Sequence, residues 1–204
     1  MLAVRDPVVV HVWPDSAPLA LDELRSERAW TVISLVTPDT TLRHAARARI
    51  RTALQDLLGA LLRRPAASIA LLSQPGQAIL LDWPETRIGL SVSHAAGLSV
   101  AAIRLGGAIG IDLIRIESGA AELPDWERVA QDYLGPQSCR RLATLPPAQR
   151  AAAFAQAWSR WEAGLKCLGL GLTEWNAALE SRLASCAVRP LAVPESYAGA
   201  MAIG

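Results

Sequence analysis

The chain has 204 residues, of which 51% are hydrophobic and 19% are charged, and its formal net charge is +1. This length and composition are typical of one large or two small globular domains with a buried core, and they exclude a disordered chain. A charge balance this close to zero creates no field over the whole molecule that would attract nucleic acid or an anionic membrane. We therefore expect neither of these partners, and any anion site must be local.

The cysteines favour a reducing compartment. Cys139, Cys167 and Cys186 are far apart and contain no C-x-x-C pair. An odd and scattered set of this kind favours neither a disulfide framework nor a structural zinc site. No secretory signal peptide is recognisable, because the first apolar run, residues 7–12, is short. We expect a cytoplasmic protein.

The apolar pattern predicts strands and helices in two successive groups. The first group has a strand at 8–13, helices at 19–30 and 42–63, and strands at 69–72, 78–81, 89–93 and 98–104. The second group has a strand at 108–116, helices at 125–134, 136–143 and 147–168, and a strand at 197–203. Gly106-Gly107 connects the groups, and a faint repeat relates segments 93–103 and 196–203. We predict an α+β fold of two similar halves, residues 1–106 and 107–204.

The stretch Gly110-Ile111-Asp112-Leu113-Ile114 contains an acid in an otherwise apolar strand. Side-chain alternation puts Asp112 and Ile114 on one face of the strand. A carboxylate on a buried face is costly unless it is paired with a cation or bound to a metal. A strand-end aspartate that caps a neighbouring turn is an equally good interpretation of this stretch by itself.

Glu162 and Lys166 lie one turn apart on the predicted helix 147–168. The simplest interpretation is an ordinary ion pair between residues i and i+4, worth about 0.2–0.5 kcal/mol. Alternatively, Glu162 binds a divalent cation and Lys166 holds a phosphate oxygen. Magnesium suits this role, because it takes one or two carboxylates, keeps several waters and accepts phosphate oxygens. The local sequence alone favours the ion pair.

Two further groups of residues are candidates for phosphate binding. Ser93 and His94 lie in a small-residue segment, 91–97, which is predicted to turn between two strands and to expose backbone N–H groups. Arginines recur every fourth residue along the predicted helix 42–63 at Arg43, Arg47 and Arg51. Guanidinium groups bind phosphate through paired hydrogen bonds. A surface histidine and a solvated helix face are the alternative interpretations.

Together these motifs resemble the 4′-phosphopantetheinyl transferase superfamily, and its monomeric type serving peptide and polyketide synthetases most closely. The signature is Gly110-Ile111-Asp112 followed, after a helical spacer, by Phe154-x-x-x-Trp158-Ser159-x-x-Glu162-Ala163-x-x-Lys166-x-x-Gly169. The Ser-His pair, the arginine-bearing helix and the final strand also match the family's pattern. The resemblance covers the chain roughly from residue 43 to its end, and the order and spacing of the motifs make it specific.

The resemblance implies two similar α+β halves in a pseudo-twofold arrangement, with the active site at their interface. It also implies a magnesium-dependent reaction with coenzyme A as substrate. A serine hydroxyl of an acyl or peptidyl carrier protein would attack the β-phosphate of coenzyme A, and 3′,5′-adenosine bisphosphate would leave. The expected protein is a cytoplasmic monomer of polyketide or nonribosomal peptide biosynthesis.

The resemblance further assigns roles to individual residues. Asp112 and Glu162 would bind the magnesium ion. Lys166 would neutralise a pyrophosphate oxygen of coenzyme A. Glu162 would act as the base for the carrier serine, directly or through a metal-bound water. These three residues, Asp112, Glu162 and Lys166, are the predicted catalytic group.

Four more residues are implied as contacts to coenzyme A. Ser93 and His94 would hold its phosphate end, alongside Lys166. Arg47 or Arg51 would hold the 3′-phosphate. Phosphoryl transfer depends mostly on positioning and on neutralising charge, and these residue types meet both needs.

The sequence departs from the family pattern at three positions. Ile114 replaces a second acid that many members have, so a water would complete the metal's ligands. Glu117 is a poor substitute, because alternation turns it to the other face of the strand. Trp161 replaces a lysine, and Gly164 lies mid-helix, where glycine costs about 1 kcal/mol relative to alanine. The alternative function is therefore a degenerate member that binds coenzyme A or a carrier protein without transferring.

Overall fold

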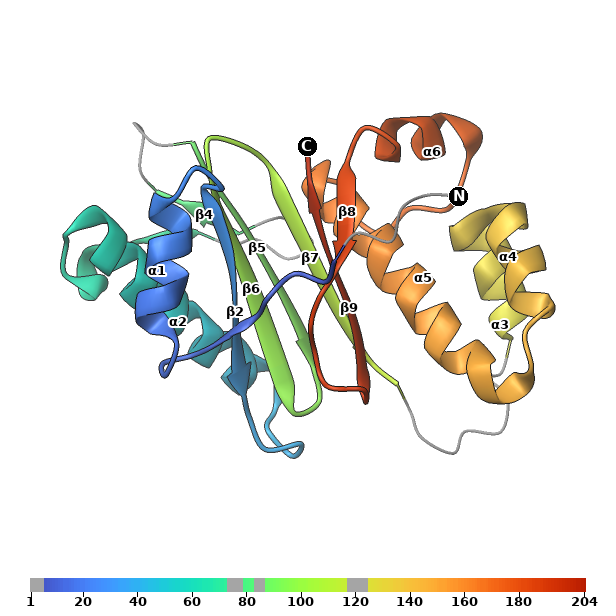
Figure 1. Cartoon of the computed structure of the whole chain (residues 1–204), viewed down its shortest axis with the longest axis horizontal. Helices are drawn as coiled ribbons and strands as arrows, with labels where there is room; N and C mark the ends of the chain where they lie inside the picture. Colours follow the sequence, from blue (N-terminus) through green and yellow to red (C-terminus); the bar gives the residue numbers. More distant parts are fainter. Residues whose placement is uncertain (1–5, 73–78, 83–86, 117–124) are drawn as a thin grey trace.

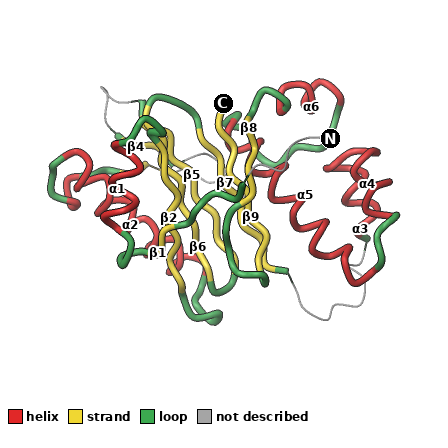
Figure 2. The backbone as a smooth tube through the Cα atoms, in the orientation of Figure 1, coloured by secondary structure: helices red, strands yellow, loops and turns green. Residues whose placement is uncertain are grey.

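The computed structural model, which describes residues 6–72, 79–82, 87–116 and 125–204, has its two larger β-sheets set side by side between helices (Figure 1). Helices α1 and α2 lie on one side of the strands, and helix α5 lies on the other. Helices α3 and α4 lie beyond α5. The tube in Figure 2 shows the same arrangement, with the strands gathered in the middle of the molecule. The predicted α+β class is confirmed.

The elements of the first half, in chain order, are β1 (His11–Val12), α1 (Ala17–Arg25), β2 (Trp30–Val36), α2 (Arg43–Leu62), η1 (Ala66–Ser68), β3 (Leu71–Leu72), β4 (Leu80–Leu81), β5 (Ile88–Ala95) and β6 (Leu98–Leu105). Strands β1, β2, β6 and β5 form one sheet in that order, and β3 pairs with β4. Only the β1–β2 pairing in the larger sheet is parallel.

The elements of the second half are β7 (Ile109–Arg115), α3 (Trp126–Val129), η2 (Ala130–Leu134), α4 (Gly135–Ala143), α5 (Pro147–Cys167), α6 (Ala177–Leu183), β8 (Ala187–Pro190) and β9 (Tyr197–Ile203). Strands β7, β9 and β8 form an antiparallel sheet in that order. The long helix α5 packs against β7 and β9. Each half thus combines a long helix with a largely antiparallel sheet, while a pseudo-twofold relation between the halves stays a prediction.

Two apolar cores explain why the central strands of the first sheet are buried on both faces. Successive residues of β2 point in opposite directions. Ile33 packs into a core beneath α1 and α2, together with the buried apolar residues of α2. Val32 packs into a second core, where it meets Ile111 of β7 and Met201 of β9. The second core therefore joins the two sheets, and we call it the inter-sheet core.

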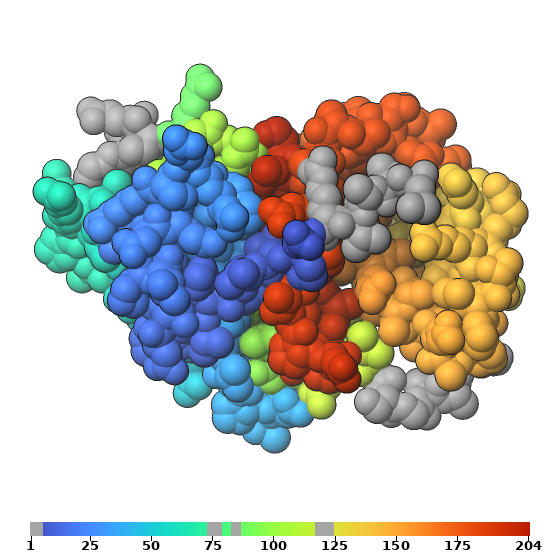
Figure 3. All heavy atoms as spheres, viewed as in Figure 1, coloured from blue at the N-terminus to red at the C-terminus, as the bar shows by residue number. Residues whose placement is uncertain are grey.

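The N-terminal segment, residues 6–13, crosses from one sheet to the other. In the second half, the backbone N–H of Val8 donates to the carbonyl of Pro190 at 2.8 Å, and Val8 forms an isolated β-bridge with Leu191. In the first half, the N–H of Trp13 donates to the carbonyl of Ser34 at 2.8 Å. Figure 3 shows the first described residues, in dark blue, against the C-terminal strands, in red.

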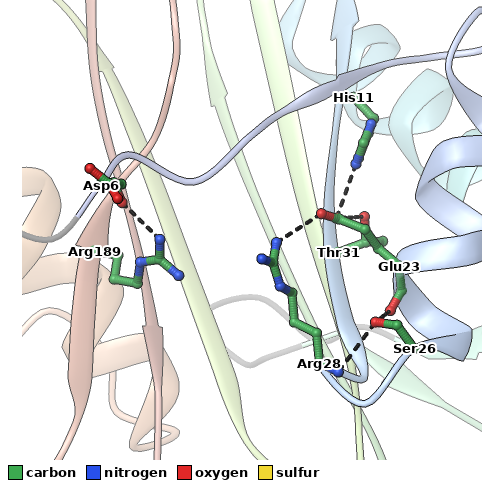
Figure 4. Close-up of polar contacts among 7 residues, drawn as sticks. All are labelled: Asp6, His11, Glu23, Ser26, Arg28, Thr31 and Arg189. Atoms are coloured by element: carbon green, nitrogen blue, oxygen red, sulfur yellow. Dashed lines mark hydrogen bonds and ion pairs between the residues drawn. The ribbon is translucent and has the colours of Figure 1, made fainter.

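Side chains fix both ends of this segment (Figure 4). Arg189 of β8 donates to the carbonyl oxygen of Asp6 at 2.8 Å. His11 lies 3.0 Å from the carboxylate of Glu23, which also accepts from Thr31 at 2.9 Å and from Arg28 at 2.9 Å. The Glu23 carboxylate therefore bonds to polar side chains from three segments of the first half. It provides a hydrogen-bond partner for His11 and Thr31, which are buried.

Several predicted elements need correction. Helix 19–30 ends at Arg25, because Trp30 starts β2, a strand that was not predicted. Helix α6 and strand β8 were not predicted either. Of the predicted strand 8–13, only His11–Val12 forms a ladder. Residue 78 of the predicted strand 78–81 lies outside the described residues, as does Glu117.

The predicted turn at 91–97 is also wrong. Strand β5 continues to Ala95, so Ser93 and His94 lie within it and pair with Val100 and Ser99 of β6. Their backbone groups belong to a strand ladder and form no cradle for an anion. Any phosphate contact from this pair must come from the side chains. The turn itself lies at residues 96–97.

No helix in the described ranges is long and apolar enough to cross a membrane.

Candidate active site

A cavity of about 760 Å³ lies where α2, β5, β7 and α5 meet. Its lining contains every site residue predicted from the sequence, namely Arg47, Arg51, Ser93, His94, Asp112, Glu162 and Lys166. These residues come from both halves of the chain. The cavity is therefore the candidate site.

Asp112 stands in the middle of β7 and is only 6% exposed. It can face α5 closely because the strand carries glycine two residues earlier. A Cβ atom on Gly110 would overlap the backbone of Ala163 and Cys167 in α5. Glycine at this position therefore allows the helix to approach the strand, and this approach brings Lys166 and Glu162 to Asp112.

The ammonium group of Lys166 lies between the two carboxylates. Its Nζ donates to Asp112 Oδ1 at 2.7 Å and to the carbonyl oxygen of Ile111 at 3.0 Å, and it lies 3.8 Å from Glu162 Oε2. The simple ion pair between Glu162 and Lys166 is thus present, but the shorter and charge-assisted bond goes to Asp112. Both interpretations of the helix motif describe part of this arrangement.

Glu162 holds its proton more tightly than an ordinary glutamate. Burial raises the pKa of its carboxyl group, and the negative charge of Asp112 raises it further. The charge of Lys166, a hydrogen bond from Trp158 and the charge of Arg43 act in the opposite direction. Glu162 and Asp112 are therefore close enough to repel each other, and a cation between them would relieve this repulsion.

The chemistry of these groups fits a divalent cation of the magnesium type. Across the part of the chain that the structure describes, no group of three or more histidine, cysteine, aspartate or glutamate side chains could hold a metal. The two carboxylates of Asp112 and Glu162 are nevertheless enough for magnesium, which takes its remaining ligands from water and phosphate. The hydrogen bonds that the described residues make to the Asp112 side chain all end on Oδ1. Its Oδ2 is thus available for such an ion.

His94 faces the same cavity in its neutral form. Burial lowers the pKa of its imidazole to about 4, with further lowering by the charges of Arg47, Arg43 and Lys166. Its Nδ1 lies 2.9 Å from the hydroxyl of Ser99, while its buried Nε2 meets no hydrogen-bond partner among the described residues. With Ser99 donating to Nδ1, the Nε2–H group can donate to an anion.

The arginine row of α2 forms the opposite wall. Arg43, Arg47 and Arg51 all line the cavity, and Arg51 donates a hydrogen bond to the carbonyl of Leu71. Arg49, which lies off this row, borders a separate surface groove. Three guanidinium groups on one wall create a local positive field in a chain whose net charge is only +1.

Two residues that were not assigned to the site from the sequence also line it. Arg43 belongs to the same helical row, and the i, i+4 spacing already marked it. Trp158, which belongs to the family signature quoted above, borders the cavity and hydrogen-bonds to Glu162. Besides that signature, the sequence offers one signal, an indole N–H of the kind that usually finds a hydrogen-bond partner when buried.

The structure shows what surrounds the three residues that depart from the family pattern. Ile114 lines the cavity on the same face as Asp112, as alternation predicts. Trp161 packs against the apolar cluster of α3, α4 and α5. At Gly164, a Cβ atom would meet the end of the Leu183 side chain. Glycine there makes room for α6, which offsets its poor helix propensity.

Comparison with known families agrees with this geometry. The cavity, with its carboxylates, its lysine and its arginine wall, has groups suited to binding a phosphate-bearing molecule. Residues 108–194 match the model of the 4′-phosphopantetheinyl transferase superfamily. No curated protein matches the chain.

The predicted resemblance is thereby confirmed over residues 108–194, which match the model of this superfamily. The match supports phosphopantetheine transfer in general. The family uses coenzyme A as its substrate and typically a divalent metal.

Proposed function

We propose that this protein transfers 4′-phosphopantetheine from coenzyme A to a serine of an acyl or peptidyl carrier protein. The observation that carries the proposal is the convergence of Asp112, Glu162 and Lys166 with the arginine wall of α2 around one cavity. The carboxylates on one side of the cavity suit a pyrophosphate with its metal. The guanidinium groups on the opposite side suit a further phosphate of the same substrate.

Glu162 is the residue proposed to act as the base in the transfer. Glu162 takes the proton of the carrier serine, whose oxygen forms a bond to the β-phosphorus of coenzyme A. The bond from that phosphorus to the bridging oxygen breaks, and 3′,5′-adenosine bisphosphate leaves with the electron pair. The family resemblance assigns this role, and burial, the largest cause of the raised pKa of Glu162, also favours it, since a base works best when its pKa is nearer the working pH.

Charge neutralisation is divided among the remaining residues. Asp112 and Glu162 would hold the divalent cation, which, when bound, supplies positive charge to the pyrophosphate oxygens. Lys166 would turn from Asp112 to a pyrophosphate oxygen when coenzyme A enters. The neutral His94 would serve the phosphate end of coenzyme A, and Arg47 or Arg51 the 3′-phosphate.

The finer assignments follow the family resemblance. We propose a cytoplasmic monomer that serves the carrier proteins of polyketide or nonribosomal peptide biosynthesis. The two halves, residues 1–106 and 107–204, are proposed to be related by a pseudo-twofold axis. Ile114 and Trp161 are compatible with the alternative function, in which the protein binds coenzyme A or a carrier without transferring.

One experiment tests the transfer. The protein is incubated with coenzyme A, magnesium and each of several apo carrier proteins, and the intact carriers are weighed by mass spectrometry. We expect a phosphopantetheine mass gain that is lost with Glu162→Gln and with a chelator. The control is Glu195→Gln, the same substitution at an exposed position, which should leave the gain unchanged.

The alternative function gives a different result in the same experiment. Calorimetric binding of coenzyme A with no mass gain on any carrier would replace the transferase by a binding protein. Absence of both binding and mass gain would contradict the two functions together.

A further inference from the structure

Two serines of β5 join the first sheet to the second through their side chains. The hydroxyl oxygen of Ser91 accepts a hydrogen bond from the backbone N–H of Ile111 at 3.0 Å, and that of Ser93 accepts from the N–H of Leu113 at 3.2 Å. Both serines are buried. Strand β7 is thereby held in register beside β5, although the two strands belong to different sheets.

Only one of the two serines reaches the carboxylate of β7. The hydroxyl of Ser93 donates its hydrogen to Asp112 Oδ1 at 2.9 Å, and the same oxygen lies 3.5 Å from Nζ of Lys166. Ser93 is 7% exposed and Asp112 6%. This bond joins one half of the chain to the proposed metal-binding carboxylate of the other half.

The bonding capacity of the Ser93 hydroxyl is fully used in this arrangement. A serine hydroxyl has one hydrogen and two lone pairs. Its hydrogen goes to Asp112, and its lone pairs face Leu113 and Lys166. No donor is left on Ser93 for a phosphate oxygen, in contrast to the contact that the family resemblance implies.

We propose that Ser93 is a positioning residue, which fixes the carboxylate of Asp112 so that Oδ2 points to the divalent cation. Occupation of Oδ1 by Ser93 and Lys166 sets the rotation of the carboxylate. When Lys166 turns toward the pyrophosphate, Ser93 is the remaining described contact that holds it. This inference rests on the proposed function. Partners of this kind commonly contribute about 10- to 100-fold to metal affinity.

The test measures Mn²⁺ binding by electron paramagnetic resonance, with saturating 3′,5′-adenosine bisphosphate or coenzyme A present and no carrier protein. We expect Ser93→Ala to weaken Mn²⁺ binding about 10- to 100-fold. The matched control is Ser91→Ala, which loses the same kind of bond between the sheets without a contact to Asp112. Ser91→Ala should keep the wild-type affinity for Mn²⁺, even if urea unfolding shows that it loses as much stability as Ser93→Ala.

A second substitution and a kinetic readout complete the design. Ser93→Cys is close to serine in shape but is a weak donor, so it should also lose affinity, and it serves alone if Ser93→Ala does not fold. In the transfer reaction, the Mg²⁺ concentration for half-maximal rate should rise while KM for coenzyme A stays within about twofold, since the predicted loss lies in the metal alone.

The outcomes separate this inference from the proposed function. Equal Mn²⁺ affinity in Ser93→Ala and Ser91→Ala, beside normal binding by the wild type, would overturn the role of Ser93. A rise in KM for coenzyme A with unchanged Mn²⁺ affinity would instead make Ser93 a direct ligand of coenzyme A. A wild-type protein that binds no Mn²⁺ under any of these conditions would contradict the proposed function itself.

Discussion

The charge state of Glu162 is governed by two neighbours that act in opposite directions. Asp112 raises the pKa of its carboxyl group, and Lys166 lowers it. Without metal or coenzyme A, we expect Asp112→Asn to lower the pKa of Glu162 and Lys166→Met to raise it. A carbon-13 NMR titration of the side-chain carboxyl would measure both shifts. Arg160→Met, at an exposed position of the same helix, is the control.

The two substitutions are expected to shift the pKa of Glu162 in opposite directions, which distinguishes this prediction from a general disturbance of the site. General loss of structure at the site would move the pKa of Glu162 in the same direction in both variants. Such a result would contradict the arrangement in which Lys166 lies between the two carboxylates. It would also remove the basis for assigning Glu162 as the base.

His94 should remain neutral throughout the physiological pH range. Its pKa is lowered from 6.5 to about 4 by burial and by Arg47, Arg43 and Lys166. As the pH falls, the imidazole of His94 is therefore protonated at a higher pH in the unfolded chain than in the folded chain. The contribution of neutral His94 to stability is present above pH 6.5 and is lost as the pH falls toward 4.

NMR of the imidazole nitrogens, assigned with His94→Gln, checks this prediction. No change of charge is expected at His94 between pH 8 and about pH 5. Urea unfolding at pH 7 and pH 4.5 should show a smaller pH-dependent loss of stability in His94→Gln than in the wild type. Titration of His94 near its ordinary pKa would mean that the imidazole is not buried beside the arginine wall.

Among the secondary-structure elements, the contact between α5 and β7 is the most sensitive to a single methyl group. A Cβ atom on Gly110 meets backbone atoms of α5, which cannot turn aside as a side chain can. We expect Gly110→Ala to lower the free energy of unfolding by about 1–3 kcal/mol and to weaken Mn²⁺ binding. Gly171→Ala, with open space around its Cβ position, should change the unfolding energy little. Similar urea midpoints for the two variants would refute the close approach.

The two long helices and most strands could be predicted from periodicity, whereas helix α6 and strands β2 and β8 were missed. Strand β2 was missed because its apolar residues are interrupted only by Thr31 and Ser34, so residues 30–36 lack the strict alternation of a half-buried strand. Both of its faces are covered, one by α2 and the other by the inter-sheet core. Strand β8 is four residues long and ends in proline, so it offers little pattern to detect.

The candidate site was easier to predict than its internal bonds. All seven predicted residues line one cavity, because motif order and spacing reflect the chemistry the site needs. The bond from Ser93 to Asp112 joins residues 19 positions apart on different sheets, and no local pattern reports such a contact. The predicted turn at Ser93 and His94 failed because small residues there suit a closely packed strand as well as a turn.

For the molecule as a whole, the N-terminal segment links the two sheets. Val8 is 2% exposed and packs in the inter-sheet core, while Val9 is 54% exposed. Val8→Ala should therefore lower the free energy of unfolding by about 1.5–3 kcal/mol. Val9→Ala should change it by less than about 0.5 kcal/mol. Chemical denaturation followed by circular dichroism would measure both.

The comparison of neighbouring valines tests the connection between the halves. Equal effects of the two substitutions would mean that residues 6–13 do not pack as described. A loss confined to Val8→Ala would show that the first residues of the chain contribute to the stability of strands in the second half. The boundary between residues 106 and 107 stays a prediction, and this contact crosses it.

The central claim is that Asp112 and Glu162 share a divalent cation with the pyrophosphate of coenzyme A. The most direct test is a crystal structure with coenzyme A and Mn²⁺, in which anomalous scattering locates the metal. The expected result is one Mn²⁺ peak bound by Asp112 Oδ2 and Glu162, with Lys166 moved from Asp112 to a pyrophosphate oxygen. Coenzyme A bound in the cavity with no metal peak between these carboxylates, and Lys166 still on Asp112, would contradict the claim.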